Sequence, residues 1–81
     1  MDALKAFNQQ INECFDRLTK SEKKIATYLM RNYEEAAFLS AADLAKRLEI
    51  SEATVVRFAY SLDLSGYPEL RQQLQELVTI Y

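Results

Sequence analysis

The side chains best suited to recognition chemistry are concentrated in the stretch EATVVRFAY that follows Ser51. Arg57 offers a planar fork of N–H donors, which can make two hydrogen bonds to guanine or a charge-assisted hydrogen bond to a phosphate. Glu52 offers only acceptors and could accept a hydrogen bond from the amino group of cytosine. The small side chains of Ala53 and Val56 could let the backbone approach and contact thymine methyl groups. These residues could therefore recognise DNA, provided that one structural element presents them together.

An α-helix that begins after Ser51 would present these residues on one face. Ser51 is a typical N-cap residue, and the apolar residues after it recur at the spacing of an inward helix face: Val55, Phe58, Ala59 and Leu62. The remaining positions form the candidate DNA-contacting face, which consists of Glu52, Ala53, Val56, Arg57, Tyr60 and Ser61. The hydroxyl groups of Ser51 and Thr54, at the start of the helix, are candidates for binding phosphates.

A second short helix is predicted immediately before this one. Ser40, with Asp43 three residues later, resembles a capping box, and the basic residues Lys46 and Arg47 suit the last turn of a helix that ends near Leu48. A helix-turn-helix needs a small residue where its two helices cross, and Ala45 is placed for that role. The apolar residues expected to lock the two helices together are Leu44, Leu48, Ile50, Val55 and Phe58. The sequence therefore predicts a helix-turn-helix at about residues 41–62. The alternative is an ordinary pair of capped helices in which Arg57 and Glu52 are merely solvated.

The rest of the chain also has helical periodicity, so we expect an all-α, five-helix, bundle-like domain over residues 1–81. The capping pair Thr19 and Glu22 begins a second helix that is expected to end near Asn32, followed by a short helical connector over residues 33–39 that carries Phe38 and Leu39 inward. Pro68 is expected at the first position of the last helix. The apolar stripe of that helix runs to the last residue, through Leu70, Leu74, Leu77, Val78 and Tyr81. Because the stripe has no stop signal, we expect the chain to be one domain of a longer protein.

The first helix, expected after Asp2, has apolar residues three and four positions apart: Leu4, Phe7, Ile11, Cys14 and Leu18. Two interpretations fit this stripe. It packs on the core of its own domain, or it also contacts the same helix of another subunit.

Composition excludes several classes of function. The 81 residues include no His, one Cys and one Gly, so the chain lacks a His-assisted nucleophile, a His-containing zinc site and a glycine-rich nucleotide loop. We therefore expect no enzymatic activity, no metal site and no cofactor, and we expect Cys14 to be a packing residue. The sequence has neither a signal peptide nor an apolar run long enough for a membrane span, which favours a soluble, cytoplasmic protein without membrane contacts.

The charge balance limits how the chain could bind DNA. Ten Lys and Arg residues against twelve Asp and Glu residues give a net charge of −2. A strongly basic surface of the kind that supports tight, autonomous DNA binding is thus not expected. Contacts with DNA must be few and local, or must be supplemented by a second copy of the chain.

Three segments of the chain together resemble one known family. The segments LTKSEKKIATYL, SAADLAKRLEISEATVVRF and SGYPELRQQL are similar to the N-terminal domain of RpiR-family transcriptional regulators. The resemblance implies the sequence-specific, double-stranded-DNA-binding domain of a bacterial regulator of sugar or related carbon metabolism, which acts as a homodimer or higher oligomer. It also implies a following sugar isomerase-type domain that senses a phosphorylated sugar. That effector would bind only to a C-terminal domain that these residues do not include.

The sequence departs from the family pattern at two kinds of position. Glu49 and Asp63 occupy places where the family usually has Gly, so a positive φ there would cost about 1 kcal/mol and could distort the turn. Ala59, Tyr60 and Ser61 stand where the family tends to have a Cys and a basic residue. These departures leave an alternative function open, namely a helical dimerisation or adaptor module that does not bind DNA.

Overall fold

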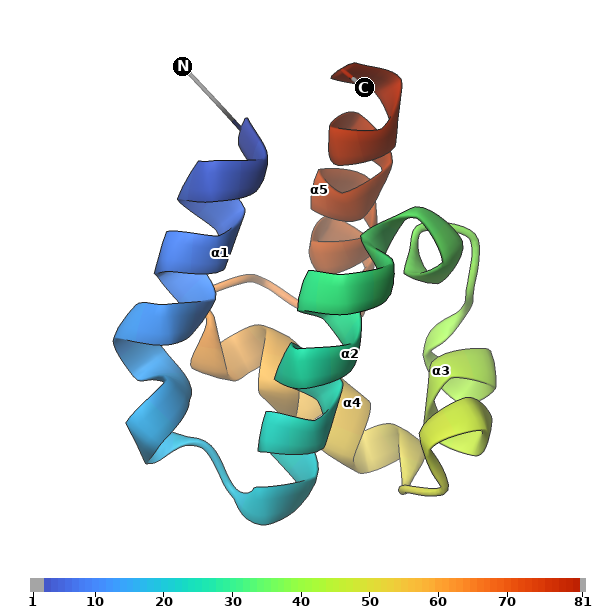
Figure 1. Cartoon of the computed structure of the whole chain (residues 1–81). Helices are drawn as coiled ribbons and strands as arrows, with labels where there is room; N and C mark the ends of the chain where they lie inside the picture. The colour runs from blue at the N-terminus through green and yellow to red at the C-terminus, as the bar shows by residue number, and fades with distance from the viewer. Residues whose placement is uncertain (1–2, 81) are drawn as a thin grey trace.

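The structure, a computed structural model, describes residues 3–80, and within them it consists of helices and short connections. In chain order, its elements are α1 (Ala3–Cys14), the 3-10 turn η1 (Phe15–Arg17), α2 (Lys20–Ala36), α3 (Ala41–Leu48), α4 (Glu52–Ser61) and α5 (Tyr67–Ile80). No strand occurs in this range, so the predicted all-α, five-helix fold is confirmed (Figure 1). Asp2, after which the first helix was expected to begin, and Tyr81, which was assigned to the last helix, lie outside the described residues.

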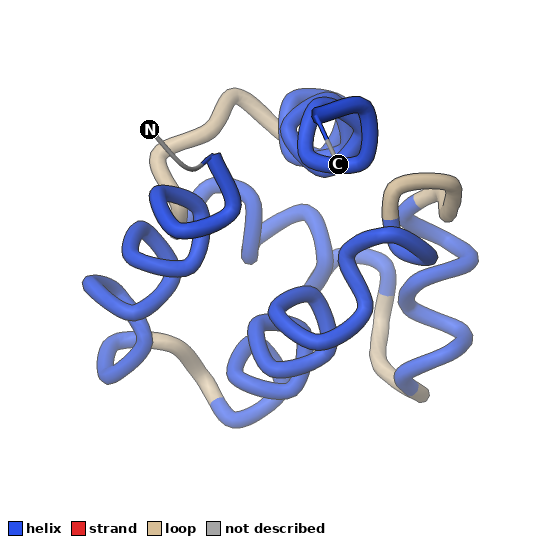
Figure 2. The backbone as a smooth tube through the Cα atoms, turned by 45° about the horizontal axis from the view of Figure 1, so that its top comes forward, coloured by secondary structure: helices blue, strands red, loops and turns tan. Residues whose placement is uncertain are grey.

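The helix α2 lies at the centre of the domain and packs against α3, α4 and α5. Figure 2 shows α1 and α3 on opposite sides of α2, with α5 viewed nearly along its axis. The start of α1 and the end of α5 lie at one end of the molecule, and the η1–α2 junction and the α3–α4 turn lie at the other (Figure 1). The two ends of the domain therefore present different segments to solvent.

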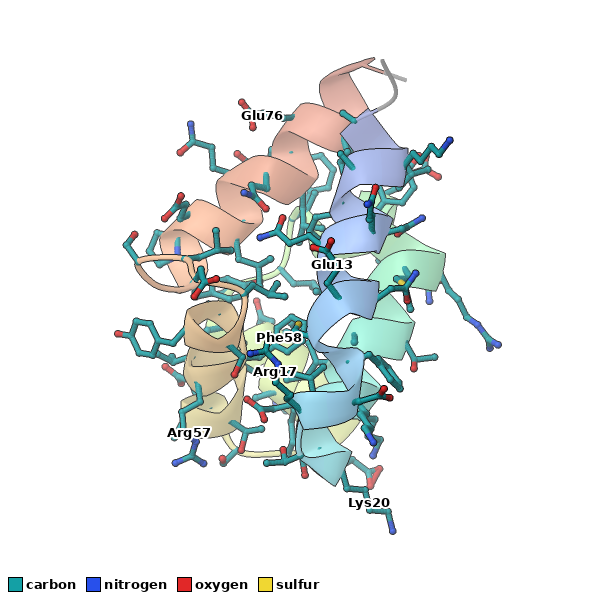
Figure 3. The ribbon with its side chains drawn as sticks, turned by 90° about the vertical axis from the view of Figure 1, so that its left-hand side faces the viewer. Glu13, Arg17, Lys20, Arg57, Phe58 and Glu76 are labelled. Carbon is teal, nitrogen blue, oxygen red and sulfur yellow. The ribbon has the colours of Figure 1, made fainter. Side chains whose placement is uncertain are left out.

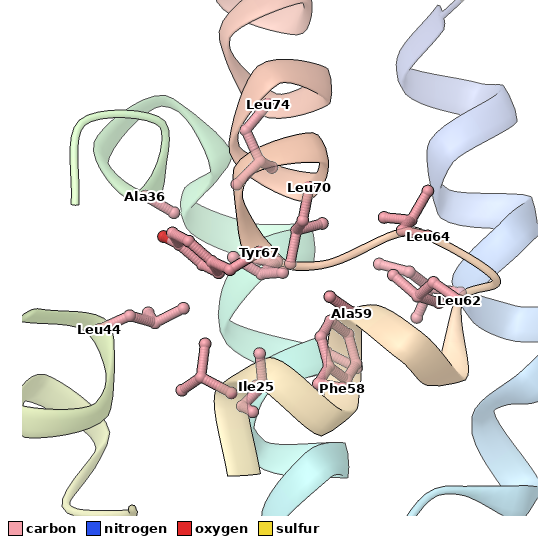
Figure 4. Close-up of a cluster of buried hydrophobic side chains, with 14 of the residues drawn as sticks. Ile25, Ala36, Leu44, Phe58, Ala59, Leu62, Leu64, Tyr67, Leu70 and Leu74 are labelled. Carbon is pink, nitrogen blue, oxygen red and sulfur yellow. The ribbon is translucent and has the colours of Figure 1, made fainter. Parts of the chain in front are cut away.

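The core contains side chains from all five helices (Figure 4). Its largest fully buried members are Phe58, Ile11, Ile25, Leu29, Leu44, Leu70, Leu74 and Val55. Removing a side chain of this kind from water contributes about 1.5–3 kcal/mol. The apolar stripes predicted from helical spacing thus meet in one core.

The apolar stripe of α1 packs on the domain's own core. Phe7 is 4% exposed, Ile11 is 0% exposed and Cys14 is 5% exposed, whereas Leu4 is half-buried. Burial raises the pKa of the Cys14 thiol, which donates a hydrogen bond to the Ile11 carbonyl at 3.4 Å. Cys14 is therefore a packing residue, as predicted, and any contact between copies of α1 would have to use residues other than these three.

The second helix begins at the predicted cap, and its helical geometry is interrupted at the predicted position. Thr19 and Glu22 form a reciprocal capping box, in which each side chain accepts a hydrogen bond from the other residue's backbone N–H. Asn32 has non-helical dihedral angles (φ −133°, ψ 38°), yet helical structure resumes after this kink and continues to Ala36. The first helical stretch thus ends near Asn32 and a short helical segment follows it, as predicted.

The prediction that Phe38 points inward is wrong. The backbone N–H groups of Ala37 and Leu39 bond to the carbonyls of Tyr33 and Ala36, which keeps residues 36–39 in tight turns. These turns bury Ala36 and Ala37 and leave Phe38 67% exposed. Leu39 is half-buried against the core.

Residues at the start of α5 hold the connection between α2 and α3. The helix begins at Tyr67, one residue before the predicted position at Pro68. The Tyr67 hydroxyl donates to the Leu39 carbonyl at 2.6 Å, and Arg71 Nε and Gln75 Nε2 each donate to the Ala37 carbonyl at 3.3 Å. Burial raises the pKa of Tyr67 to about 12. The SGYPELR segment therefore has an architectural role in this domain.

Candidate nucleic-acid interface

The helices α3 and α4 form the predicted helix-turn-helix. Ala45 is 4% exposed in the packed core, as expected for the small residue at the helix crossing. Four members of the expected locking set are buried, namely Leu44, Leu48, Val55 and Phe58, and Ile50 is half-buried. The two helices are therefore held together by the residues that the spacing predicted.

The turn between the helices has the left-handed residue that the motif requires. Glu49 adopts φ 58° and ψ 46°, and the next N–H, that of Ile50, donates to the Ala45 carbonyl at 2.9 Å. This pattern satisfies carbonyl groups at the end of α3. Asp63 likewise has φ 63°, just after α4. The two non-glycine residues that stand where the family usually has Gly thus adopt positive φ, and α3 ends in an ordinary left-handed cap.

The start of α4 brings three polar side chains together. The Ser51 hydroxyl accepts a hydrogen bond from the Thr54 N–H at 3.2 Å, which confirms Ser51 as the N-cap. The hydroxyl oxygens of Ser51 and Thr54 are 2.7 Å apart, and Arg57 Nη2 lies 3.5 Å from the Thr54 hydroxyl. The guanidinium of Arg57 is therefore close to both hydroxyls that were predicted to bind phosphates.

The predicted DNA-contacting face lies on the side of α4 that faces away from the core. Its members Glu52, Ala53, Arg57 and Tyr60 are exposed and Val56 is half-buried. Of the two residues predicted to bind phosphates, Ser51 is exposed and Thr54 is half-buried. Tyr60 is 55% exposed, which is unusual for a large aromatic side chain in this domain. The structure thus presents all seven predicted site residues at the surface of one short helix and its N-cap.

Ser61, which was also assigned to this face, has a different position. It is half-buried, and its hydroxyl lies 3.1 Å both from Glu22 Oε2 and from the Arg57 carbonyl. A hydroxyl used in this way fixes a helix to its neighbours. The assignment of Ser61 to the outer face was therefore wrong.

Two contacts that local patterns did not predict fix the C-terminal end of α4. Glu22, only 7% exposed, accepts hydrogen bonds from the Thr19 N–H through Oε1 and from Ser61 through Oε2. Gln10 Nε2 of α1 donates to the Leu62 carbonyl at 2.9 Å. Spacing along the chain predicts neither of these long-range contacts, although it did predict Glu22 as a member of a capping box. The outer face of α4 thus has a fixed orientation relative to α1 and α2.

Basic residues near α4 differ in their availability. The Arg47 guanidinium forms an ion pair with Glu35 and donates to the Tyr28 hydroxyl, so it is engaged within the domain. Figure 3 shows Arg57 and Lys20 extending from the same end of the molecule. Sequence reasoning did not assign Lys20 to the site, because it lies far from the helix-turn-helix along the chain.

A metal-binding cluster and a membrane-spanning helix are both absent from the part of the chain that is described. Among residues 3–80, no three His, Cys, Asp or Glu side chains form a group that could hold a metal ion. Within the same residues, the helices are too short or too polar to cross a membrane.

Comparison with known proteins identifies relatives with the same domain. The helix-turn-helix domain of the rpiR family matches residues 5–79. The chain is 41% identical over 73 residues to the HTH-type transcriptional regulator HexR of Pseudomonas aeruginosa, a match that covers 90% of this chain and 26% of that protein. It is 38% identical over 71 residues to an uncharacterized HTH-type transcriptional regulator of Haemophilus influenzae, covering 86% of this chain and 25% of that protein. The chain thus spans about a quarter of the length of these relatives. Together with the geometry of α3 and α4, these matches show that the chain belongs to the rpiR family of helix-turn-helix domains.

Proposed function

We propose that this chain is the sequence-specific DNA-binding domain of a bacterial transcriptional regulator, and that α4 inserts into the major groove. The observation that carries the proposal is the outer face of α4, where Glu52, Arg57 and Tyr60 are exposed although the opposite face of the same helix is buried. A helix held in this way by a helix-turn-helix can contact base edges with the residues of its N-terminal half. The names of the two relatives, both transcriptional regulators, support the same function.

Each residue of the outer face has a distinct chemical role in this proposal. Arg57 donates to guanine or to a phosphate, and Glu52 accepts from the amino group of cytosine. Ala53 and Val56 allow close approach to thymine methyl groups. The aromatic ring and hydroxyl of Tyr60 contact the DNA at the far end of the face. The hydroxyl groups of Ser51 and Thr54 bind backbone phosphates and so set the depth of the helix in the groove.

The proposal for the whole protein goes further than this domain. A homodimer or higher oligomer would place two copies of α4 on two half-sites, which compensates for the small number of basic residues in each copy. A phosphorylated sugar or related metabolite would act through a separate C-terminal domain, and regulation would concern sugar or related carbon metabolism in the cytoplasm. These parts of the proposal rest on the family resemblance.

The decisive experiment is selection of a duplex library on the purified chain, followed by affinity measurements on the selected and a scrambled duplex. We expect a consensus sequence, and we expect Arg57→Ala to weaken binding to it by about 1–3 kcal/mol. Arg31→Ala, at an exposed position near the opposite end of α2, is the matched control and should leave binding unchanged. If wild-type protein selects no consensus and binds neither duplex, the proposal fails and a dimerisation or adaptor module becomes the better interpretation.

A further inference from the structure

We infer that the η1–α2 junction is a second DNA contact, in which Arg17 and Lys20 bind backbone phosphates beside the groove occupied by α4. This inference rests on the proposed function and adds a contact surface outside the helix-turn-helix. The second contact would affect how tightly the domain binds DNA and where α4 lies along the groove, because phosphate contacts position a protein on DNA without recognising its sequence.

The junction lies directly beside α4. Arg17, together with Cys14 and Leu18, lines a small hollow of about 120 Å³ whose fourth wall is Ser61, in the last turn of α4. Lys20 is the first residue of α2 and extends from the same end of the molecule as Arg57 (Figure 3). A DNA strand that borders α4 would therefore pass close to both side chains.

The charges of Arg17 and Lys20 are available to a partner. Both residues are exposed, and no ion pair involves either of them among residues 3–80. Two other basic residues are engaged within the domain, since Arg47 pairs with Glu35 and Lys23 lies over the Phe15 ring, with Nζ 5.4 Å from its centroid. Arg17 and Lys20 therefore lose no internal ion pair when they bind a phosphate.

The local charge balance is opposite to that of the whole chain. Residues 16–24 include four basic and two acidic side chains, although the chain as a whole has a net charge of −2. One of the two acidic residues, Glu22, is buried, and both of its oxygens accept hydrogen bonds. Asp16 is the one exposed carboxylate of the segment. The segment that forms the junction thus carries a net positive charge, although the whole chain is net negative.

The distance between the junction and α4 is fixed by hydrogen bonds. The Glu22 carboxylate joins the Thr19 N–H at 2.9 Å to the Ser61 hydroxyl at 3.1 Å, so the residue before Lys20 is connected to the last turn of α4. A phosphate held at the junction would consequently restrict where α4 can lie along the groove. Preorganised contacts of this kind require little ordering of the protein on binding.

The test measures DNA affinity for two double variants that each remove two positive charges, one at the junction and one elsewhere, and for a third that keeps both charges at the junction. Arg17→Gln with Lys20→Gln should reduce affinity for the selected and the scrambled duplex alike, by about ten-fold or more near 0.1 M salt. The slope of log Kobs against log salt concentration should become shallower by about 0.9 for each lost phosphate contact. Lys5→Gln with Arg31→Gln alters exposed residues toward the opposite end of the molecule and should retain the wild-type slope. Arg17→Lys with Lys20→Arg keeps both charges and should also retain it.

The outcomes separate this inference from the proposed function. If wild-type protein binds DNA and Arg57→Ala weakens it, but the Arg17 and Lys20 double variant behaves like its control, the second contact is refuted and the proposed function stands. If wild-type protein binds no DNA, both are refuted. Thermal unfolding monitored by circular dichroism checks that each double variant, altered only at exposed positions, is folded.

Discussion

The Ser61 hydroxyl donates a hydrogen bond to Glu22 Oε2 at 3.1 Å, across 39 positions of sequence. The bond joins the last turn of α4 to the capping box that begins α2. Glu22 is the one charged side chain classed as buried among the described residues, and its other oxygen bonds to the Thr19 N–H. The N-terminal cap of one helix is therefore also the anchor of another.

Ser61→Ala should lower the free energy of unfolding by about 1–2 kcal/mol, because it leaves one oxygen of a buried carboxylate without its donor. Urea denaturation monitored by circular dichroism measures the change. Thr27→Ala, at an exposed position of α2, controls for the higher helix propensity of Ala and should not destabilise the protein. A Ser61→Ala variant as stable as wild type would show that the bond contributes nothing net.

Glu49→Gly should raise the free energy of unfolding by about 0.5–1 kcal/mol, because Glu49 adopts φ 58° and Gly adopts this conformation without a steric penalty. Asp63→Gly should give a smaller gain, since Asp tolerates the left-handed conformation better. Differential scanning calorimetry should show a higher Tm for both variants. Glu76→Gly, within α5, is the control and should lower stability by about 1 kcal/mol.

Glu52→Gln should increase affinity for scrambled DNA and narrow the difference between the selected and scrambled duplexes. Glu52 is exposed in the first turn of α4, where its charge repels the phosphate backbone unless a cytosine amino group is within reach. Fluorescence anisotropy with both duplexes measures the two affinities. Glu34→Gln, at an exposed position near the end of α2, should change neither affinity. Equal loss of affinity for both duplexes would contradict the repulsive role of Glu52.

Tyr67 should make the domain less stable as the pH rises above about 10. Burial raises its pKa from 10.0 to about 12, so the folded state favours the neutral phenol. This contribution is fully present below the unfolded pKa and is lost as the pH rises from 10 to 12, because the unfolded chain releases the proton more readily. Urea unfolding across that range should show the decline for wild type and a weaker one for Tyr67→Phe. Tyr60→Phe, at an exposed position, should decline like wild type.

Features that depend on a few neighbouring residues could be predicted from the sequence. The caps at Thr19, Ser40 and Ser51 have the expected hydrogen bonds, since each bond joins residues three positions apart. The positive φ at Glu49 and Asp63 was raised as a possibility only through the family resemblance, because the family usually has Gly at these two positions.

Features that depend on distant segments could not be predicted in the same way. Ser61 lies on the predicted outer face by helical spacing, and only the position of Glu22 makes it an internal donor. Phe38 is large and apolar, yet the turns of residues 36–39 direct it to solvent. The bond from Gln10 to the Leu62 carbonyl spans 52 positions of sequence. Each of these outcomes is decided by packing between helices, which spacing along one helix does not specify.

The anchoring of α4 from several sides has a consequence for engineering. A graft of residues 40–62 onto an unrelated scaffold would keep both N-caps but would lose Gln10 of α1, Glu22 of α2 and the leucines of α5. Without these partners the tilt of α4 would not be fixed. The excised helix-turn-helix would therefore not recognise its DNA sequence on the new scaffold. Altered targets are better sought by exchanging the solvent-facing side chains of α4 within the intact domain.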